Sequence, residues 1–82
     1  MPEIVNVKPD YIFFMKVTLN NRPETIEGKD AITVRELLDL KNYTFKFLVV
    51  RINGQTVRPG EYEQSIIHDG DDVKVIHLIS GG

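Results

Sequence analysis

Alternation of apolar and polar residues marks the first predicted element of the chain. In "FFMKVTL", residues 13–19, the odd-numbered positions are all apolar, whereas Lys16 and Thr18 share the opposite face with Phe14. This period of two is typical of a half-buried β-strand. The asparagines of "NNR" tolerate the left-handed conformation of a tight turn, and "PETIE", residues 23–27, follows as a short strand. A β-hairpin is therefore expected first.

The period then changes to that of a helix in "TVRELLDLK", residues 33–41. Val34, Leu37 and Leu38 recur at helical spacing and predict one buried face. Thr33 is expected to be the N-cap, and Glu36, three residues later, completes a capping box. One helix follows the hairpin.

The second half of the chain predicts more strands. "FKFLVVRI", residues 45–52, is rich in β-branched and aromatic residues, and Asn53-Gly54 is a strong hairpin signal before the short strand "QTVR". "RPGEY" and "HDGDD" are expected to form turns at residues 58–62 and 68–72. "VKVIHLI", residues 73–79, is the last predicted strand.

A sheet of this size builds one core, so the helix is expected to cover its apolar face in an α+β roll. The predicted domain spans residues 13–79, between an N-terminal extension, residues 1–12, and a flexible C-terminal tail, residues 80–82. The extension contains Pro2 and Pro9, and is either a frayed arm or an added edge strand.

Composition narrows the function classes. A chain of 82 residues supports one small domain, and 41% hydrophobic with 27% charged residues fits a folded one. The net charge of −2 and the absence of a basic stripe argue against nucleic acid and anionic membranes as partners. With no long apolar run and no signal-peptide pattern, a cytoplasmic location is expected.

The residue types also limit the chemistry. The chain has no cysteine, which excludes disulfides, thiolate nucleophiles and iron–sulfur clusters. His68 and His77 are too few for a metal site of their own. Asp69, Asp71 and Asp72 match no complete calcium loop, so "HDGDD" is interpreted as a turn. We expect no metal and no bound cofactor.

The outer face of the sheet is unusually apolar. The alternation places five apolar residues there: Phe14, Phe47, Val49, Ile76 and Leu78. Lys16, Arg51 and Lys74 are expected at the rim, and an apolar patch with a charged border commonly marks a protein interface. Two other interpretations of this apolar face are open. A strand could have the opposite phase, so that its apolar residues face the core, or residues 1–12 could cover the face.

The segments "TVRELL", "INGQTV" and "IIHDGDDVKVIHLISGG" resemble the sulfur-carrier family that includes the thiamine-biosynthesis carrier ThiS and the molybdopterin synthase small subunit MoaD. The resemblance covers residues 13–82 and is closer to the thiamine type at "HDGDD". Residues 1–12, the short link "DLKNYTFKF" and "VRPGEY" depart from the family pattern. The resemblance implies a ubiquitin-like β-grasp roll, a mixed sheet whose last strand lies centrally beside the first.

The resemblance also implies a protein co-substrate rather than an enzyme. The Gly82 carboxylate would be adenylylated by an E1-like adenylyltransferase that uses ATP and magnesium, and sulfur from a persulfide donor would convert it to a thiocarboxylate. Gly81 and Gly82 lack a Cβ and could enter a narrow channel, and residues 80–82, beginning at Ser80, reach at most about 10 Å. The outer face and Ser80 would contact the partners, and the free protein is expected to be a monomer.

Three functions are compatible with these features. The favoured one is a sulfur carrier for thiamine thiazole formation or a related thiolation, with thiazole synthase as acceptor. The second is the small subunit of a molybdopterin-synthase-like enzyme, which would form a stable complex with a large catalytic subunit. The third is a ubiquitin-like modifier or interaction module, for which isopeptide-linked lysine adducts would be the sign. A frayed terminus without function is the simplest alternative for the tail.

Overall fold

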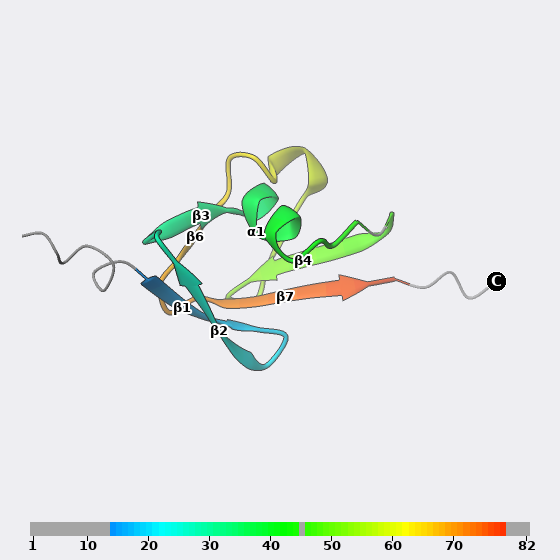
Figure 1. Cartoon of the computed structure of the whole chain (residues 1–82). Helices are drawn as coiled ribbons and strands as arrows, with labels where there is room; N and C mark the ends of the chain where they lie inside the picture. The colour runs from blue at the N-terminus through cyan, green and yellow to red at the C-terminus, as the bar shows by residue number, and fades with distance from the viewer. Residues whose placement is uncertain (1–13, 45, 79–82) are drawn as a thin grey trace, which may run out of the picture.

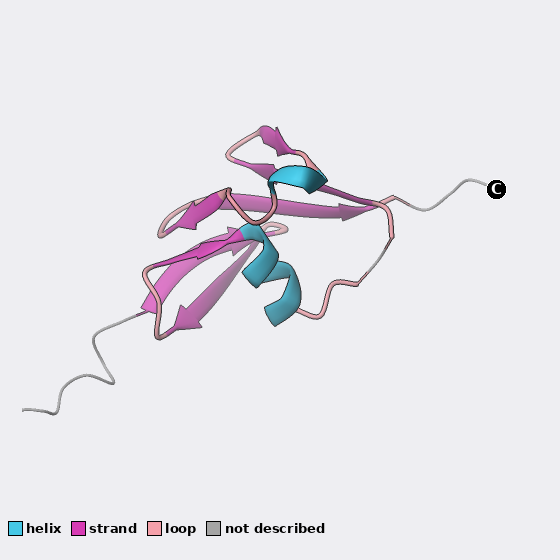
Figure 2. Cartoon of the chain, turned by 90° about the horizontal axis from the view of Figure 1, so that it is seen from above, coloured by secondary structure: helices cyan, strands magenta, loops and turns pink. Residues whose placement is uncertain are grey.

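The computed structural model describes residues 14–44 and 46–78, which form two sheets and one main helix (Figure 1). The larger sheet has five strands in the order β2-β1-β7-β4-β5, and the smaller one pairs β3 with β6. The strands are β1 (Phe14–Leu19), β2 (Arg22–Glu27), β3 (Ala31–Thr33), β4 (Leu48–Ile52), β5 (Gln55–Val57), β6 (Ile66–His68) and β7 (Asp72–His77). Helix α1 (Val34–Leu40) lies over one face of the larger sheet, and a 3₁₀ turn, η3 (Pro59–Glu61), follows β5 (Figure 2).

The last strand occupies the middle of the larger sheet. β7 runs parallel to β1, with Thr18 opposite Asp72, and antiparallel to β4, with Val49 opposite Ile76. A parallel pair needs a long crossover connection, and here the helix and the intervening strands provide it. The predicted mixed sheet of β-grasp type is confirmed.

Both predicted hairpins form through two-residue turns with positive φ angles. Asn20 and Asn21 have φ values of 52° and 69° between β1 and β2. Asn53 and Gly54 have φ values of 51° and 86° between β4 and β5. Positive φ at both central residues gives the turn twist that matches two antiparallel strands, and asparagine and glycine adopt it at low cost.

The helix begins with the predicted capping box. The Thr33 hydroxyl accepts a hydrogen bond from the Glu36 amide at 3.0 Å, and the Glu36 carboxylate accepts one from the Thr33 amide at 2.8 Å. Two amide groups that would otherwise lack helical partners are therefore satisfied. Val34, Leu37 and Leu38 are buried, as their spacing predicted.

The core lies between α1 and the inner face of the larger sheet. It is built from aliphatic side chains of every strand and of the helix, with one aromatic ring, that of Tyr62. In the part of the chain that the structure describes, no polar or charged residue is fully buried. The buried residues are Met15, Val17, Leu19, Ile26, Ile32, Val34, Leu37, Leu38, Val50, Val57, Tyr62, Ile67, Val73 and Val75.

Several elements differ from the sequence prediction. The small β3–β6 sheet was not predicted, because each strand has only three residues and pairs with a distant segment. "RPGEY" contains η3, and its Tyr62 enters the core. β4 begins at Leu48 instead of residue 45, and β7 ends at His77 instead of residue 79. The predicted extension, residues 1–12, and the tail, residues 80–82, lie outside the described residues.

Candidate functional site

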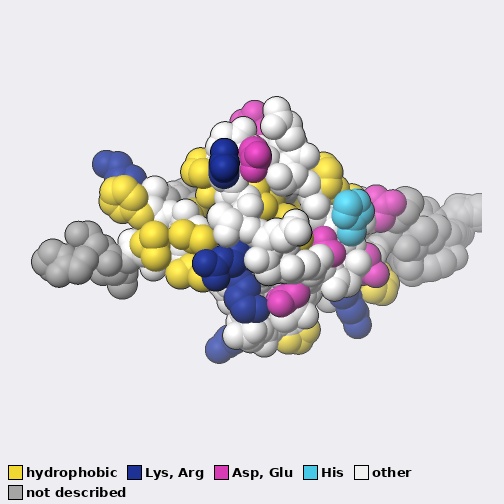
Figure 3. Space-filling model, turned by 180° about the vertical axis from the view of Figure 1, so that it is seen from behind, with side chains coloured by type: hydrophobic (Ala, Val, Ile, Leu, Met, Phe, Trp, Pro, Cys, Tyr) yellow, Lys and Arg dark blue, Asp and Glu magenta, His cyan; other side chains and the backbone are white. Residues whose placement is uncertain are grey.

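Four apolar residues meet on the outer face of the sheet, at the end where β7 finishes. Phe47 and Leu78 are 58% and 50% exposed, Ile76 is also exposed, and Val49 is half-buried. Val49 lies opposite Ile76, and the Leu78 amide donates to the Phe47 carbonyl oxygen at 2.9 Å. We call Phe47, Val49, Ile76 and Leu78 the outer patch. Hydrophobic side chains gather at this end of the molecule in Figure 3.

Two cationic side chains border the outer patch. Arg51 is exposed and lies opposite the half-buried Lys74 in the β4–β7 pairing. Like charges directly across two strands repel, and Asp72 reduces this repulsion because its carboxylate accepts from Lys74 Nζ at 3.1 Å. The predicted rim at Arg51 and Lys74 is confirmed in position, and it gives the outer patch a positive border.

Phe14 and Lys16 do not belong to this cluster. Both lie on the outer face, as predicted, but the β1–β7 register pairs Thr18 with Asp72. Phe14 precedes Thr18 by four residues and Ile76 follows Asp72 by four, so about 25 Å separates them along the strands. The Lys16 carbonyl instead accepts from the Gly70 amide, at the opposite end of β7. Grouping these two residues with the outer patch was wrong.

The C-terminal residues begin beside the outer patch. Leu78 is the last described residue, and its amide hydrogen bond to Phe47 keeps it next to β4. Ser80, Gly81 and Gly82 lie outside the described residues. Gly82 follows Leu78 by four residues, and four fully extended residues span at most about 13 Å.

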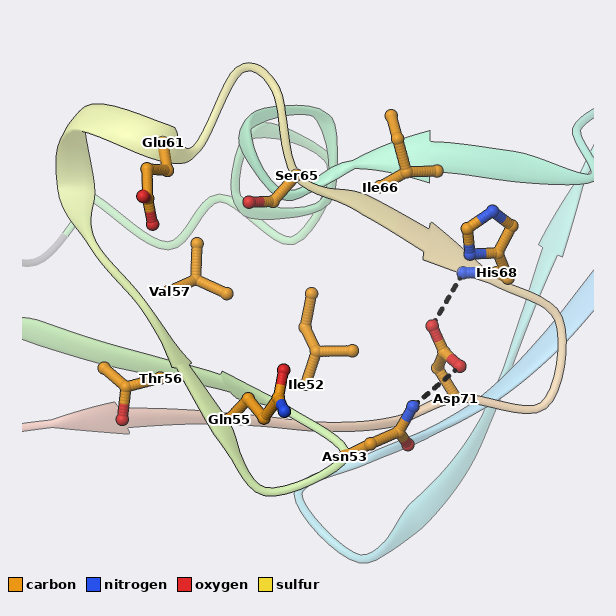
Figure 4. A pocket seen from close by; sticks show the side chains of 10 residues that line it. All are labelled: Ile52, Asn53, Gln55, Thr56, Val57, Glu61, Ser65, Ile66, His68 and Asp71. Atoms are coloured by element: carbon orange, nitrogen blue, oxygen red, sulfur yellow. Dashed lines mark hydrogen bonds between the residues drawn. The ribbon is translucent and has the colours of Figure 1, made fainter.

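The Asn53-Gly54 turn and the "HDGDD" turn are joined in one hydrogen-bonded unit (Figure 4). Asn53 Nδ2 donates to Asp71 Oδ1 at 3.0 Å, and Asp71 Oδ2 accepts from the His68 amide at 2.9 Å. Asn53 Oδ1 in turn accepts from the Asp72 amide at 2.8 Å. We call this network the turn clasp. It joins the β4–β5 turn to the turn that precedes β7.

The turn clasp holds the start of β7 against its neighbouring strands. The Thr18 amide donates to the Asp71 carbonyl oxygen at 2.9 Å, so the same turn is also held against β1. The pocket beside the clasp has a volume of about 620 Å³ and lies between β5, η3 and β6 (Figure 4). The Asp71 carboxylate is occupied by backbone and amide donors, which supports the interpretation of "HDGDD" as a structural turn.

The described residues contain no group of three or more His, Cys, Asp or Glu side chains placed to hold a metal ion. Within the same residues, no helix has the length and apolar character needed to cross a membrane.

Comparison with known proteins gives a consistent result. The family model of the ThiS family matches residues 17–82. The sulfur carrier protein ThiS of Thermus thermophilus is 33% identical over 66 residues, which cover 80% of this chain and 98% of that protein. The crystal structure of the thiamine biosynthesis protein ThiS of Geobacter metallireducens superposes with a TM-score of 0.74 at 30% identity. This superposition covers 83% of this chain and 100% of the Geobacter chain.

An NMR solution structure of a thiamine biosynthesis protein from Geobacter metallireducens is also similar to this chain. Its TM-score is 0.66 at 30% identity, and it covers 83% of this chain and 88% of that one. The family model includes the central strand β7, the turn clasp and the two terminal glycines within its match. The chain therefore belongs to the ThiS family of sulfur carrier proteins.

Proposed function

We propose that the Gly82 carboxylate carries the transferred sulfur. A carboxylate resists nucleophiles, so it first needs a good leaving group. One carboxylate oxygen would attack the α-phosphorus of ATP, releasing pyrophosphate and leaving an acyl-adenylate. The terminal sulfur of a donor persulfide would then attack the acyl carbon and displace AMP, which gives an acyl disulfide between Gly82 and the donor. A thiol of the activating system would attack the donor sulfur of this disulfide, releasing the C-terminal thiocarboxylate and leaving a disulfide between that thiol and the donor. The family match through Gly82 is the observation that supports this proposal.

The protein itself supplies position rather than catalysis. An E1-like adenylyltransferase would bind ATP and magnesium, and this chain would present Gly81 and Gly82 to it. The outer patch, with Ser80 and the cations Arg51 and Lys74, forms the docking surface in this proposal. Apolar contacts at the centre with charges at the border are typical of protein interfaces. The partner is expected to offer an apolar surface with an acidic border.

Thiazole formation in thiamine biosynthesis is the favoured destination of the sulfur. The similar Geobacter protein is described as a thiamine biosynthesis protein, which supports thiazole synthase as the acceptor. Molybdopterin synthesis is the alternative suggested by the wider resemblance of the motifs. Reconstitution of the thiocarboxylate form with each acceptor enzyme separates them, because only the correct acceptor would consume the thiocarboxylate.

Intact-mass spectrometry tests the proposal directly. After incubation with an activating enzyme, ATP, magnesium and a sulfur donor, the mass should rise by the difference between one sulfur and one oxygen atom. The matched control lacks Gly81 and Gly82 and should show no change. Its melting temperature should equal that of the full chain, because the described core includes neither glycine. An unchanged mass of the full chain with a proven active partner would reject the proposal.

The variant Gly82→Ala keeps the length of the tail and adds one Cβ. If the channel of the activating enzyme is narrow, adenylate formation should slow about tenfold, equivalent to about 1.4 kcal/mol of transition-state stabilisation. Pyrophosphate release measures this rate. A rate equal to that of the unmodified chain would mean that the channel is wide at this position.

A further inference from the structure

A second groove lies away from the tail, between the free edge of β2 and helix α1. It has a volume of about 390 Å³, and one wall is the Leu40 side chain, which is 60% exposed. We call it the β2 groove. Its lining residues are Ile26, Glu27, Lys29, Ile32, Glu36, Asp39 and Leu40. None of the outer-patch residues lines it, so it is a separate surface.

Within residues 14–44 and 46–78, no strand pairs with the outer edge of β2, so its main-chain groups are presented along this groove. β2 is the outermost strand of the larger sheet, and the pair Leu19 and Arg22 closes its two-residue hairpin turn. Hydrogen-bonded pairs alternate along an antiparallel ladder, so Thr25 and Glu27 direct their N–H and C=O groups away from β1. Lys16, the residue opposite Thr25 on β1, fits this alternation. Its main-chain amide and carbonyl groups both form hydrogen bonds on the β7 side of β1, and not toward β2.

These outward groups can accept a further strand. Pro23 is the first outward position and has no N–H, which weakens pairing at the turn end of β2. Thr25 and Glu27 offer two donors and two acceptors in the register of an added strand. As far as the described residues show, the part of the edge suited to an extended backbone lies beside the groove.

The two walls of the β2 groove are already held together. Lys41 Nζ, at the end of α1, lies 2.9 Å from Glu24 Oε2 on β2, and both side chains are partly buried. Leu37 and Leu38 anchor the same helix in the core. A ligand would meet a formed groove, which reduces the ordering cost of binding.

The charge around the groove is negative. The carboxylates of Glu27, Glu36 and Asp39 face a single lining cation, Lys29, whose Nζ lies 4.0 Å from Glu36. Arg35, outside the lining, lies 3.8 Å from Asp39. An excess of carboxylates favours a ligand with lysine or arginine near its ends.

We propose that the β2 groove binds an extended segment of a partner protein in which aliphatic side chains alternate and basic residues flank them. The segment adds as a strand beside Thr25 and Glu27, and its aliphatic side chains cover Leu40. Because the groove and the outer patch are separate, one protein could hold the carrier while another acts on its tail. This interaction goes beyond sulfur transfer and does not depend on the proposed chemistry of Gly82.

The test uses the full chain, labelled with ¹⁵N, and an acetylated, amidated peptide of sequence Lys-Val-Thr-Val-Thr-Val-Lys. Saturable chemical-shift changes are expected at the amides of Thr25, Glu27 and Leu40. The variant Leu40→Ser should weaken binding at least about fivefold, because it removes the apolar wall. Phe47→Ser, a matched loss of an exposed apolar side chain on the outer patch, should leave the affinity unchanged.

Altered peptides separate the contributions of backbone and charge. Successive N–H groups of a strand point to opposite sides, so one peptide has an N-methyl group on the central valine and another has it on the threonine that follows. If a strand is added, one of these two peptides should lose most of its binding and the other should keep most of it. A peptide with glutamate in place of both lysines should bind at least about fivefold more weakly at low salt, and this difference should shrink as salt rises.

Distinct outcomes would overturn the proposal. They are shifts centred on the outer patch, no saturable shift at any residue, or full affinity in Leu40→Ser with an unchanged melting temperature. If Leu40→Ser melts lower, Glu27→Lys replaces it, and it should weaken binding of the lysine peptide. Leu40→Ser should still undergo the thiocarboxylate mass change, so failure of this proposal is distinguishable from failure of the proposed function.

Discussion

Val49 and Val50 are neighbours on β4 with identical side chains, yet they lie in different environments. Val50 is 0% exposed and packs in the core, whereas Val49 is half-buried on the outer face, opposite Ile76. The inner face is apolar because it closes the core against α1. The outer face gathers four apolar residues at the end where β7 finishes, and α1 does not cover it. The comparison separates residues that stabilise the fold from residues available to a partner.

The largest expected effect comes from placing the same charge on each face. Val50→Asp buries a carboxylate without a partner, which should cost about 4 kcal/mol or more, a large part of the stability of a small domain. Circular dichroism should show no cooperative thermal transition. Val49→Asp is the matched control and should melt cooperatively, because its carboxylate can reach water. Loss of folding in both variants would contradict the distinction between the faces.

Helix α1 permits a similar comparison with a smaller effect. Leu37 is 0% exposed, and Leu37→Ala should lower the free energy of unfolding by about 2–4 kcal/mol through lost burial and a cavity. Leu40→Ala, at an exposed position, should change it by less than about 0.5 kcal/mol. Urea denaturation followed by circular dichroism measures both values. A cost for Leu40→Ala near that for Leu37→Ala would mean that Leu40 is covered in solution.

Two exposed phenylalanines sharpen the comparison within the outer face itself. Phe47→Ala should weaken binding to the proposed activating enzyme by about 1–2 kcal/mol, because an aromatic side chain at an interface centre contributes strongly. Phe14→Ala should have little effect, since Phe14 lies at the other end of the strands. Calorimetric titration of each variant against the enzyme gives the two affinities. A larger loss of affinity for Phe14→Ala than for Phe47→Ala would indicate that the docking surface lies at the start of β1.

The smallest expected effect on stability concerns the ion pair between Lys41 and Glu24, at the border of the inner face. The hydrogen bond with Glu24 raises the pKa of Lys41, despite partial desolvation, above its usual value of 10.5. A raised folded-state pKa stabilises the protein below the unfolded pKa, and the benefit is lost as pH rises through the folded value. Lys41→Gln should therefore lower stability by less than about 1 kcal/mol at pH 7.

The pH dependence of this variant provides its control. The difference between Lys41→Gln and the unmodified chain should disappear in urea titrations at a pH above the raised pKa of Lys41, where both carry an uncharged side chain. A difference that persists there would assign the effect to packing of the lysine stem instead of its charge.

Local signals accounted for the hairpins and the helix. Asn20-Asn21 and Asn53-Gly54 adopt the positive φ angles that their side chains permit, and Thr33 with Glu36 closes the predicted capping box. Each of these features depends on residues within a few positions of one another. Sequence reasoning succeeds there because the interactions that decide the conformation are themselves local.

The β3–β6 sheet and the buried ring of Tyr62 could not be predicted in this way. Ile32 pairs with Ile67, 35 positions later, and neither three-residue strand shows a periodic pattern. Tyr62 follows a 3₁₀ turn, where no alternation indicates which side chain is buried. The turn clasp between Asn53 and Asp71 likewise joins two turns that are each explained locally.

The amino-acid sequence by itself determined which residues share a face, because a β-strand alternates its side chains with a period of two whatever it pairs with. The sequence by itself also limited the possible chemistry, through its two terminal glycines and its lack of cysteine. Only the tertiary structure decided which outer-face residues are neighbours. The register of β1 against β7 separates Phe14 from Ile76, and that register is set by contacts such as Gly70 to Lys16, between segments more than 50 positions apart. A pairing between distant segments depends on how the whole core packs, which no local pattern encodes.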